Sequence, residues 1–263
     1  MNVSIKISRY QLRDLLRSKV LIIYTAFFFL VTYCLFRFVG DTSKVVVSLM
    51  NIILIIIPLI SIIFGTTYYY NSREFIVLLL AQPINRSSLF TGMCIGVSLP
   101  LIMGFLAGVG IPLVIWGAVT LHDIDTVLML LFSGALLTFI FVAMAFFISV
   151  ANEDKLRGLG ISLLLWLLLS VVYDGLVMLA VVLFADYPLE TPLIVLSILN
   201  PIDLARVLIL LKFDISALMG YTGAVFQKFF GSSFGMLISL ISLTFWAAIS
   251  FAMGMKFFKN KDF

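Results

Sequence analysis

The chain has 263 residues, of which 63% are hydrophobic and 11% are charged, with a formal net charge of +4. Soluble domains average about 45–50% apolar and about 25% charged residues. This composition excludes a soluble globular domain, because so much apolar surface requires lipid as its solvent. A membrane-spanning helix needs roughly 20 apolar residues, since the hydrocarbon core is about 30 Å thick. The chain therefore has room for several spans and little else.

Residues 1–19 carry too many charges, spread too evenly, for a cleavable signal peptide, and we expect them to form an amphipathic helix instead. At 100° per residue, apolar residues fall on one arc and basic residues on the adjacent one. The apolar set is Ile5, Leu12, Leu15 and Leu16, and the basic set is Lys6, Arg9, Arg13 and Arg17. Such a helix lies in the membrane interface with its cations near anionic headgroups. A plain basic anchor for the first span is the alternative.

Six long apolar segments are predicted to cross the membrane. They cover residues 20–37, 45–67, 95–119, 127–150, 159–184 and 234–258. Pro100 and Pro112 are expected to kink the third span, which a bundle tolerates when neighbouring helices satisfy the freed backbone groups. No fixed-period repeat or Ser/Gly-rich linker divides the chain. We therefore predict an all-α integral membrane protein with a single transmembrane domain over residues 1–263.

The distribution of basic residues predicts the orientation, because cytoplasmic loops carry an excess of Lys and Arg. With six alternating spans, twelve of the 17 Lys and Arg residues fall on the side of the two termini. The five on the opposite side are Arg37, Lys44, Arg206, Lys212 and Lys228. Both termini are therefore expected in the cytoplasm, and the segment 185–233 is expected outside it.

Residues 68–92, YYYNSREFIVLLLAQPINRSSLFTG, form a half-polar stretch on the expected cytoplasmic side. The three tyrosines suit the membrane interface. Arg73–Leu80 is predicted to form a short helix that ends before Pro83, because the residue before a proline disfavours the α region. Asn85 is a candidate N-cap for the third span. A short, largely apolar helix exposed to the cytoplasm is expected to bind another protein.

The segment 185–233 contains two apolar runs, each too short to span, on either side of Asn200-Pro201. Runs of this length are typical of re-entrant or interfacial helices. Asn200-Pro201 is a turn signal, and Asp203 then falls in the first turn of the second helix. We expect a cap over the outer end of the bundle. A seventh span remains the alternative, although it would place the C-terminal lysines outside.

Residues suited to enzymatic chemistry are few. The chain has no GxxxxGK[ST] loop, so it does not bind ATP by that mechanism. His122, Asp123 and Asp125 share an outward loop and fit either a transient divalent-metal site or a polar turn. The scattered methionines, Cys34 and Cys94 are interpreted as packing residues rather than a copper path. We predict no catalytic site, resident metal, cofactor or nucleic-acid partner.

Asp174, in VVYDGLV, is the clearest charge within a predicted span. Carboxylates at that depth are costly and face a cavity, a partner or the bundle interior. Packing against a polar group of another helix and lining a substrate path are both open for this residue.

The run SREFIVLLLAQPINRSSLFTG resembles the segment after the second span of type-2 ABC export permeases. The matching residues are Glu74, Leu79, Leu80, Pro83, Ile84, Arg86, Leu89 and Gly92. The run departs from the family pattern at residues 75–77, at Asn85, and at Met93 in place of the usual Lys. In that family this segment is a coupling helix that binds a separate ATPase. The resemblance thus implies a homodimer with two ATPase subunits, and it assigns coupling roles to Arg73, Glu74, Leu79, Leu80, Pro83 and Arg86 in the region 71–86.

Within that family, LNPIDLARVLIL is similar to the corresponding run of the NosY-type permeases, which serve nitrous oxide reductase maturation. The resemblance implies a bacterial inner-membrane protein that delivers a sulfur species or copper for the copper centres of the reductase. It also implies contact with a periplasmic accessory protein of the copper-chaperone type through Asn200, Pro201, Asp203 and Arg206. A general exporter of drugs, lipids or polysaccharide, a gliding or secretion permease, and a non-transporting scaffold remain alternatives.

Overall fold

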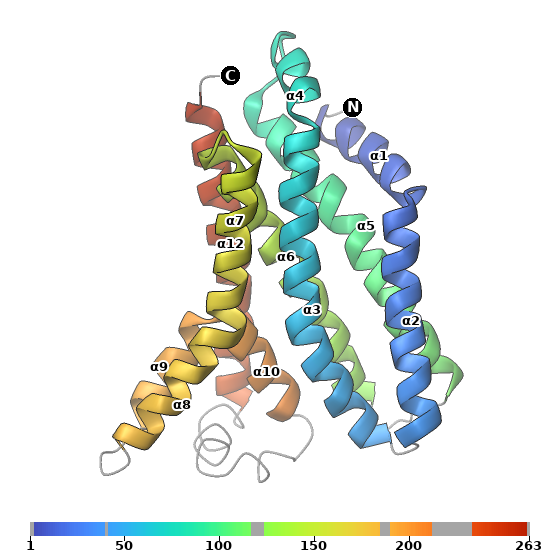
Figure 1. The fold of residues 1–263 in the computed structure, drawn as a ribbon, viewed down its shortest axis with the longest axis vertical. Coiled ribbons are helices and arrows are strands. Elements are labelled where there is room, and N and C mark those ends of the chain that lie inside the picture. Colours follow the sequence, from blue (N-terminus) through green and yellow to red (C-terminus); the bar gives the residue numbers. More distant parts are fainter. Residues whose placement is uncertain (1–2, 40–41, 117–123, 185–189, 212–232, 262–263) are drawn as a thin grey trace.

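The computed structural model describes residues 3–39, 42–116, 124–184, 190–211 and 233–261, and every regular element among them is a helix (Figure 1). Six helical segments are long and apolar enough to cross a membrane. They are α2 (Lys19–Val39), α3 (Thr42–Asn71), α5 (Arg86–Ile115), α6 (Ile124–Ala151), the continuous run of α7 (Lys155–Leu167), η1 (Leu168–Val172) and α8 (Tyr173–Leu183), and α12 (Ser233–Asn260). The prediction of an all-α membrane protein with six spans is confirmed.

The remaining helices lie at the two ends of the bundle. Helix α1 (Val3–Leu16) and helix α4 (Arg73–Leu80) lie at the end that also carries both termini, called here the α4 end. Helices α9 (Glu190–Leu199) and α10 (Pro201–Leu211) form a hairpin at the opposite end, called here the hairpin end. The loop with His122 and Asp123 and residues 212–232 of the predicted outer segment lie outside the described residues.

Helix α6 is the centre of the core and contacts α3, α5, α10 and α12. Its side chains Phe141 and Phe146 are fully buried. The Phe146 ring lies edge-on to Phe90 of α5, with ring centroids 6.0 Å apart. Phe90 in turn lies 5.5 Å from Phe258 of α12. Aromatic pairs at such distances add to area burial, so these rings fasten three spans together at the α4 end.

The third span begins at Arg86, well before the predicted start at residue 95. Leu89, Phe90 and Met93 in this added part are completely buried. The helix thus starts directly after Asn85, the residue predicted as its N-cap, and the periodic apolar residues before residue 95 pack into the core. Helix α5 remains one element through Pro100 and Pro112.

Helix α1 packs along α5 at the α4 end. The hydroxyl of Ser8 donates to the carbonyl of Gly92 at 2.9 Å. A Cβ at Gly96 would lie 2.2 Å from Oε1 of Gln11, so only glycine permits this approach. The face in contact with α5 therefore includes Ser8 and Gln11, which the predicted apolar arc omitted. Leu15 of that arc is buried, but Leu16 is 39% exposed.

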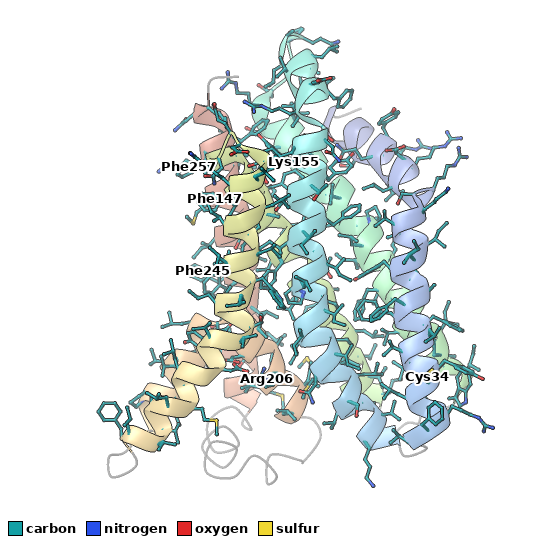
Figure 2. The ribbon with its side chains drawn as sticks, viewed as in Figure 1. Cys34, Phe147, Lys155, Arg206, Phe245 and Phe257 are labelled. Carbon is teal, nitrogen blue, oxygen red and sulfur yellow. The ribbon has the colours of Figure 1, made fainter. Side chains whose placement is uncertain are left out.

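The outer helices expose apolar side chains all along their length (Figure 2). No residue of α8 is buried, and α2 and α12 expose large apolar residues such as Ile23 and Phe245. Lipid, or another subunit, must cover these faces, because in water they would be strongly unfavourable.

Candidate functional sites

Helix α4 stands immediately after the third helix and presents an apolar surface to solvent. Phe75, Val77 and Leu78 are 42%, 44% and 61% exposed. Ile76 is completely buried and anchors the helix to the core. The structure thus confirms the short helix predicted for Arg73–Leu80.

The other predicted coupling residues are distributed around this helix. Glu74 is exposed beside the apolar surface, and Pro83 is exposed in the turn that follows. Leu79 and Leu80 are half-buried and pack against the core. The apolar residues that face outward are therefore Phe75 and Val77, two of the positions at which the sequence departs from the family pattern, together with Leu78.

Two arginines that flank α4 fasten it to the rest of the bundle. Nη1 of Arg73 donates to the carbonyl of Glu153, in the connection between α6 and α7, at 3.1 Å. Nη1 of Arg86 donates to the carbonyls of Lys259 and Lys261, at the end of α12, at 2.7 and 2.8 Å. Both guanidinium groups thus contact their own chain. These long-range contacts were not visible in the sequence, because backbone carbonyls carry no residue signature.

The connection between α6 and α7 is held against the end of α3. The hydroxyl of Tyr70 donates to the carbonyl of Asn152 at 2.9 Å. Nζ of Lys155 donates to Oδ1 of Asn71 at 3.0 Å. The Asp154 side chain accepts from the amide of Leu156 at 2.9 Å and so caps α7. These hydrogen bonds fix the connection between α6 and α7, which in turn accepts the hydrogen bond from Arg73 at the start of α4.

Asn85 occupies the N-cap position of α5 with an extended backbone, φ −64° and ψ 124°, but its side chain makes no capping hydrogen bond. Met93, the position at which the family pattern has Lys, is completely buried. A lysine at this depth would be costly, so the apolar residue suits its surroundings here.

The α9–α10 hairpin turns at Asn200-Pro201 with a bend of 114°. Oδ1 of Asn200 accepts from the amide of Ile202 at 3.0 Å, and Pro201 occupies the first helical position. Both features favour the start of a helix at this point. The two short helices are therefore sharply bent at the predicted turn, as in a re-entrant loop or a broken span.

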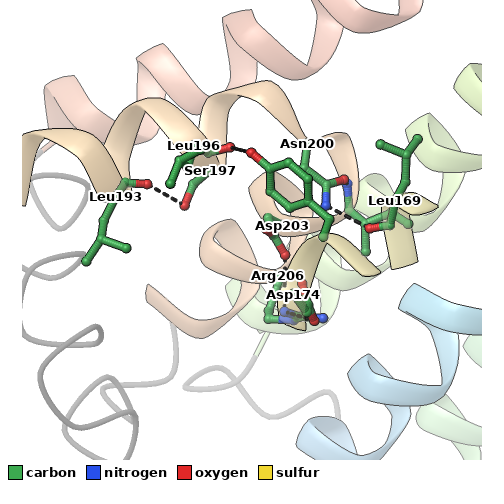
Figure 3. A network of polar contacts seen from close by, with 10 residues as sticks. Leu169, Asp174, Leu193, Leu196, Ser197, Asn200, Asp203 and Arg206 are labelled. Carbon is green, nitrogen blue, oxygen red and sulfur yellow. Dashed lines mark hydrogen bonds and ion pairs between the residues drawn. The ribbon is translucent and has the colours of Figure 1, made fainter. Parts of the chain in front are cut away.

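The same asparagine fastens the hairpin to the fifth span (Figure 3). Nδ2 of Asn200 donates to the carbonyl of Leu169, within the π-helical turn η1, at 2.8 Å. The hydroxyl of Tyr173 donates to the carbonyl of Leu196 at 2.5 Å. A π-helical turn disturbs the regular backbone pairing. Within this π-helical turn, the Asn200 side chain thus supplies a hydrogen-bond donor to the carbonyl of Leu169.

An ion network completes this junction. Nη1 of Arg206 lies 2.7 Å from Oδ2 of Asp174 and 3.1 Å from Oδ1 of Asp203. The three side chains are 25%, 35% and 11% exposed, in that order. Burial raises the pKa of the Asp203 carboxyl, and nearby Asp174 raises it further, whereas Arg206 lowers it. The guanidinium of Arg206 is therefore the counter-ion of both the Asp174 and the Asp203 carboxylate.

The structure brings together residues that sequence reasoning treated separately. For Asp174, contact with a polar group of another helix was one of two open alternatives, and the family resemblance assigned Arg206 to a partner surface. In the sequence, this pairing is indicated only by an acid, Asp174, in one apolar segment and an arginine, Arg206, in another. Asn200 and Pro201 are buried as well, so the hairpin side chains named above contact their own chain.

The described residues contain no group of three or more His, Cys, Asp and Glu that could hold a metal ion.

The model of the ABC-2 family transporter proteins matches residues 5–263. The chain belongs to this family. It is 29% identical over 233 residues to a probable ABC transporter permease protein NosY of Pseudomonas aeruginosa, which covers 81% of this chain and 84% of the relative. It is 28% identical over 188 residues to the corresponding NosY protein of Stutzerimonas stutzeri, covering 66% of this chain and 67% of the relative.

The ABC-2 match fixes the general role of the chain. It is a NosY-like permease subunit, the membrane component of an ABC transporter. Membership in this family implies an ATPase partner and a location in the membrane.

Proposed function

We propose that this permease couples ATP hydrolysis by a separate ATPase to delivery of a sulfur species or copper for the copper centres of nitrous oxide reductase. The exposed apolar surface of α4 is the observation that supports binding of an ATPase. Burial of apolar area contributes about 25 cal/mol per Å². A soluble subunit that covers Phe75, Val77 and Leu78 gains this free energy, and Glu74 beside them supplies a charge for specificity.

In the proposed assembly two permeases form a homodimer in the bacterial inner membrane, with one ATPase bound to each α4 end. The excess of basic residues on that side supports its placement in the cytoplasm with both termini. The apolar faces of α2, α8 and α12 supply area for contact between permeases. The orientation of α4 that the ATPase requires would be held by the remaining predicted coupling residues, which are Arg73, Arg86, Leu79, Leu80 and Pro83.

The hairpin end would then face the periplasm, where a copper-chaperone-type accessory protein binds. The shape of that surface would depend on four mostly buried residues that support it without being fully exposed. They are Asn200, Pro201, Asp203 and Arg206. Asp174 would hold Arg206 and so fix the angle of the hairpin.

Copurification with the cognate ATPase tests the coupling assignment. Leu78→Asp and Glu74→Lys are expected to lose the ATPase while the permease remains folded. Asp14→Lys is the matched control, because Asp14 is an exposed acid of α1 at the same end of the bundle. Retention of the ATPase by both α4 variants, with ATP hydrolysis still coupled, would refute the assignment.

The cargo requires a separate measurement. Deletion of the gene is expected to lower the copper and sulfide content of nitrous oxide reductase in the same cells. A catalytically inactive ATPase should give the same defect, which distinguishes transport from passive scaffolding. Full assembly of the copper centres in the deletion strain would instead favour a general exporter.

A further inference from the structure

A cavity of about 490 Å³ lies between the ends of α6 and α12, at the α4 end of the bundle. Its lining includes Ala151, Glu153, Lys256, Phe257 and Lys261. The Phe257 ring is 47% exposed, and its centroid lies 5.1 Å from that of Phe147 on α6. The cavity thus has an apolar wall on the side of the bundle and polar groups toward the end.

Cationic groups predominate at its polar side. Lys256 is exposed and has no ion pair or hydrogen bond with the described part of the chain. Nζ of Lys261 donates to the carbonyl of Val150 at 2.6 Å, which holds this ammonium group at the rim. Glu153 contributes one negative charge against these two positive ones. The arrangement suits an anion that carries its own apolar tail.

We propose that this cavity binds one anionic glycerophospholipid, with its phosphate near Lys256 and Lys261 and an acyl chain along Phe257 and Phe147. Because α6 and α12 both cross the membrane, the ends of these helices lie at the depth of the lipid headgroups. Basic pockets between transmembrane helices are suited to anionic headgroups.

The walls of the cavity are also the supports of α4. Arg73 donates to the carbonyl of Glu153 on one wall, and Arg86 donates to the carbonyls of Lys259 and Lys261 on the other. A lipid that holds the two walls together therefore steadies both arginine contacts. The binding site requires only a bilayer, whereas its effect on ATPase coupling rests on the proposed function.

Lipid binding is tested on the full-length chain, purified and delipidated in detergent, by native mass spectrometry. Phosphatidylglycerol is the anionic probe, phosphatidylcholine is the neutral comparator, and inorganic phosphate is the competitor. Phosphatidylglycerol is expected to bind more tightly than phosphatidylcholine, and inorganic phosphate is expected not to displace it. Lys256→Gln should weaken its binding about fivefold, which is the usual contribution of one lysine beside an anionic lipid.

Two further variants sharpen the test. Ala151→Trp should abolish lipid binding by filling the cavity without a change of charge. Lys19→Gln is the matched control, since Lys19 is an exposed lysine near the same end but outside the cavity lining, and it should bind lipid as the unmodified chain does. Equal binding of the two lipids, or equal affinity of Lys256→Gln and Lys19→Gln, would overturn the proposal. Displacement of the lipid by inorganic phosphate would assign the site to a free anion and would also overturn it.

The link to α4 has its own readout, which needs no ATPase. Phosphatidylglycerol should slow trypsin cleavage after Arg73 and Arg86 in the unmodified chain, and should not slow it in Lys256→Gln. Equal protection in both proteins would contradict the link. Loss of ATPase copurification in the α4 variants, by contrast, concerns only the proposed function.

Discussion

The guanidinium of Arg206 lies 2.7 Å from the carboxylate of Asp174 and thereby joins α10 to α8. Asp203 shares the same guanidinium at 3.1 Å. Together with the Asn200 contact to Leu169, this pairing fixes the hairpin to the fifth span at its π-helical turn.

The shared guanidinium predicts an asymmetry between two substitutions. Arg206→Gln leaves two carboxylates facing each other, whereas Asp174→Asn leaves a balanced pair of Asp203 and Arg206. We expect Arg206→Gln to cost about 2 kcal/mol of unfolding free energy, less than for a fully buried pair because the groups are partly exposed. Asp174→Asn should cost less than half of this. Thermal unfolding in detergent measures both, and an equal or larger cost for Asp174→Asn would contradict the network.

Asn200→Ala removes both the cap of α10 and the donor to Leu169. Loss of a cap costs about 1 kcal/mol, and an unsatisfied buried carbonyl adds a similar amount. We expect faster hydrogen exchange throughout residues 190–211, measured by mass spectrometry. Gln82→Ala, in an exposed turn at the other end, is the control and should leave this segment unchanged. Unchanged exchange in Asn200→Ala would mean that the hairpin is held by its apolar contacts alone.

Two glycines of α7 should respond to alanine with opposite signs. A Cβ at Gly158 would lie 2.0 Å from the Tyr70 hydroxyl, whereas a Cβ at Gly160 meets nothing within 4 Å. Gly158→Ala therefore has to displace Tyr70 from Asn152 and should destabilise the protein by about 1–3 kcal/mol. Gly160→Ala should stabilise it by about 0.5–1 kcal/mol, because alanine favours the helix. Thermal midpoints that shift in the same direction would refute this packing.

Gln11 is 2% exposed, and neither polar atom of its amide has a hydrogen-bond partner in the described structure. A buried unsatisfied amide costs about 1–3 kcal/mol. Gln11→Met keeps the length of the side chain and removes these polar atoms. We therefore expect a higher midpoint of thermal unfolding and slower proteolysis of α1. A lower midpoint would show that the amide has a partner, such as water or another subunit.

Much of the architecture follows from the sequence alone, because the bilayer restricts the choices. A chain with so few charges must span the membrane, and in lipid every backbone group needs an internal partner. Continuous apolar segments of about 20 residues satisfy this need as helices. The short helix Arg73–Leu80 and the turn at Asn200-Pro201 were also predictable, since proline and capping residues act within a few positions of the chain.

Tertiary structure alone decided which polar groups meet. Asp174 and Arg206 lie in different segments, and nothing local specifies that α10 folds back onto α8. Gln11 lies on the packed face of α1 because Gly96 allows a close approach, which outweighs the apolar arc of the helix. Likewise, the sequence suggests that Arg73 and Arg86 are charges for an ATPase, but both donate hydrogen bonds to backbone carbonyls of their own chain. Local patterns are set by the backbone over a few residues, whereas these contacts depend on how distant helices pack.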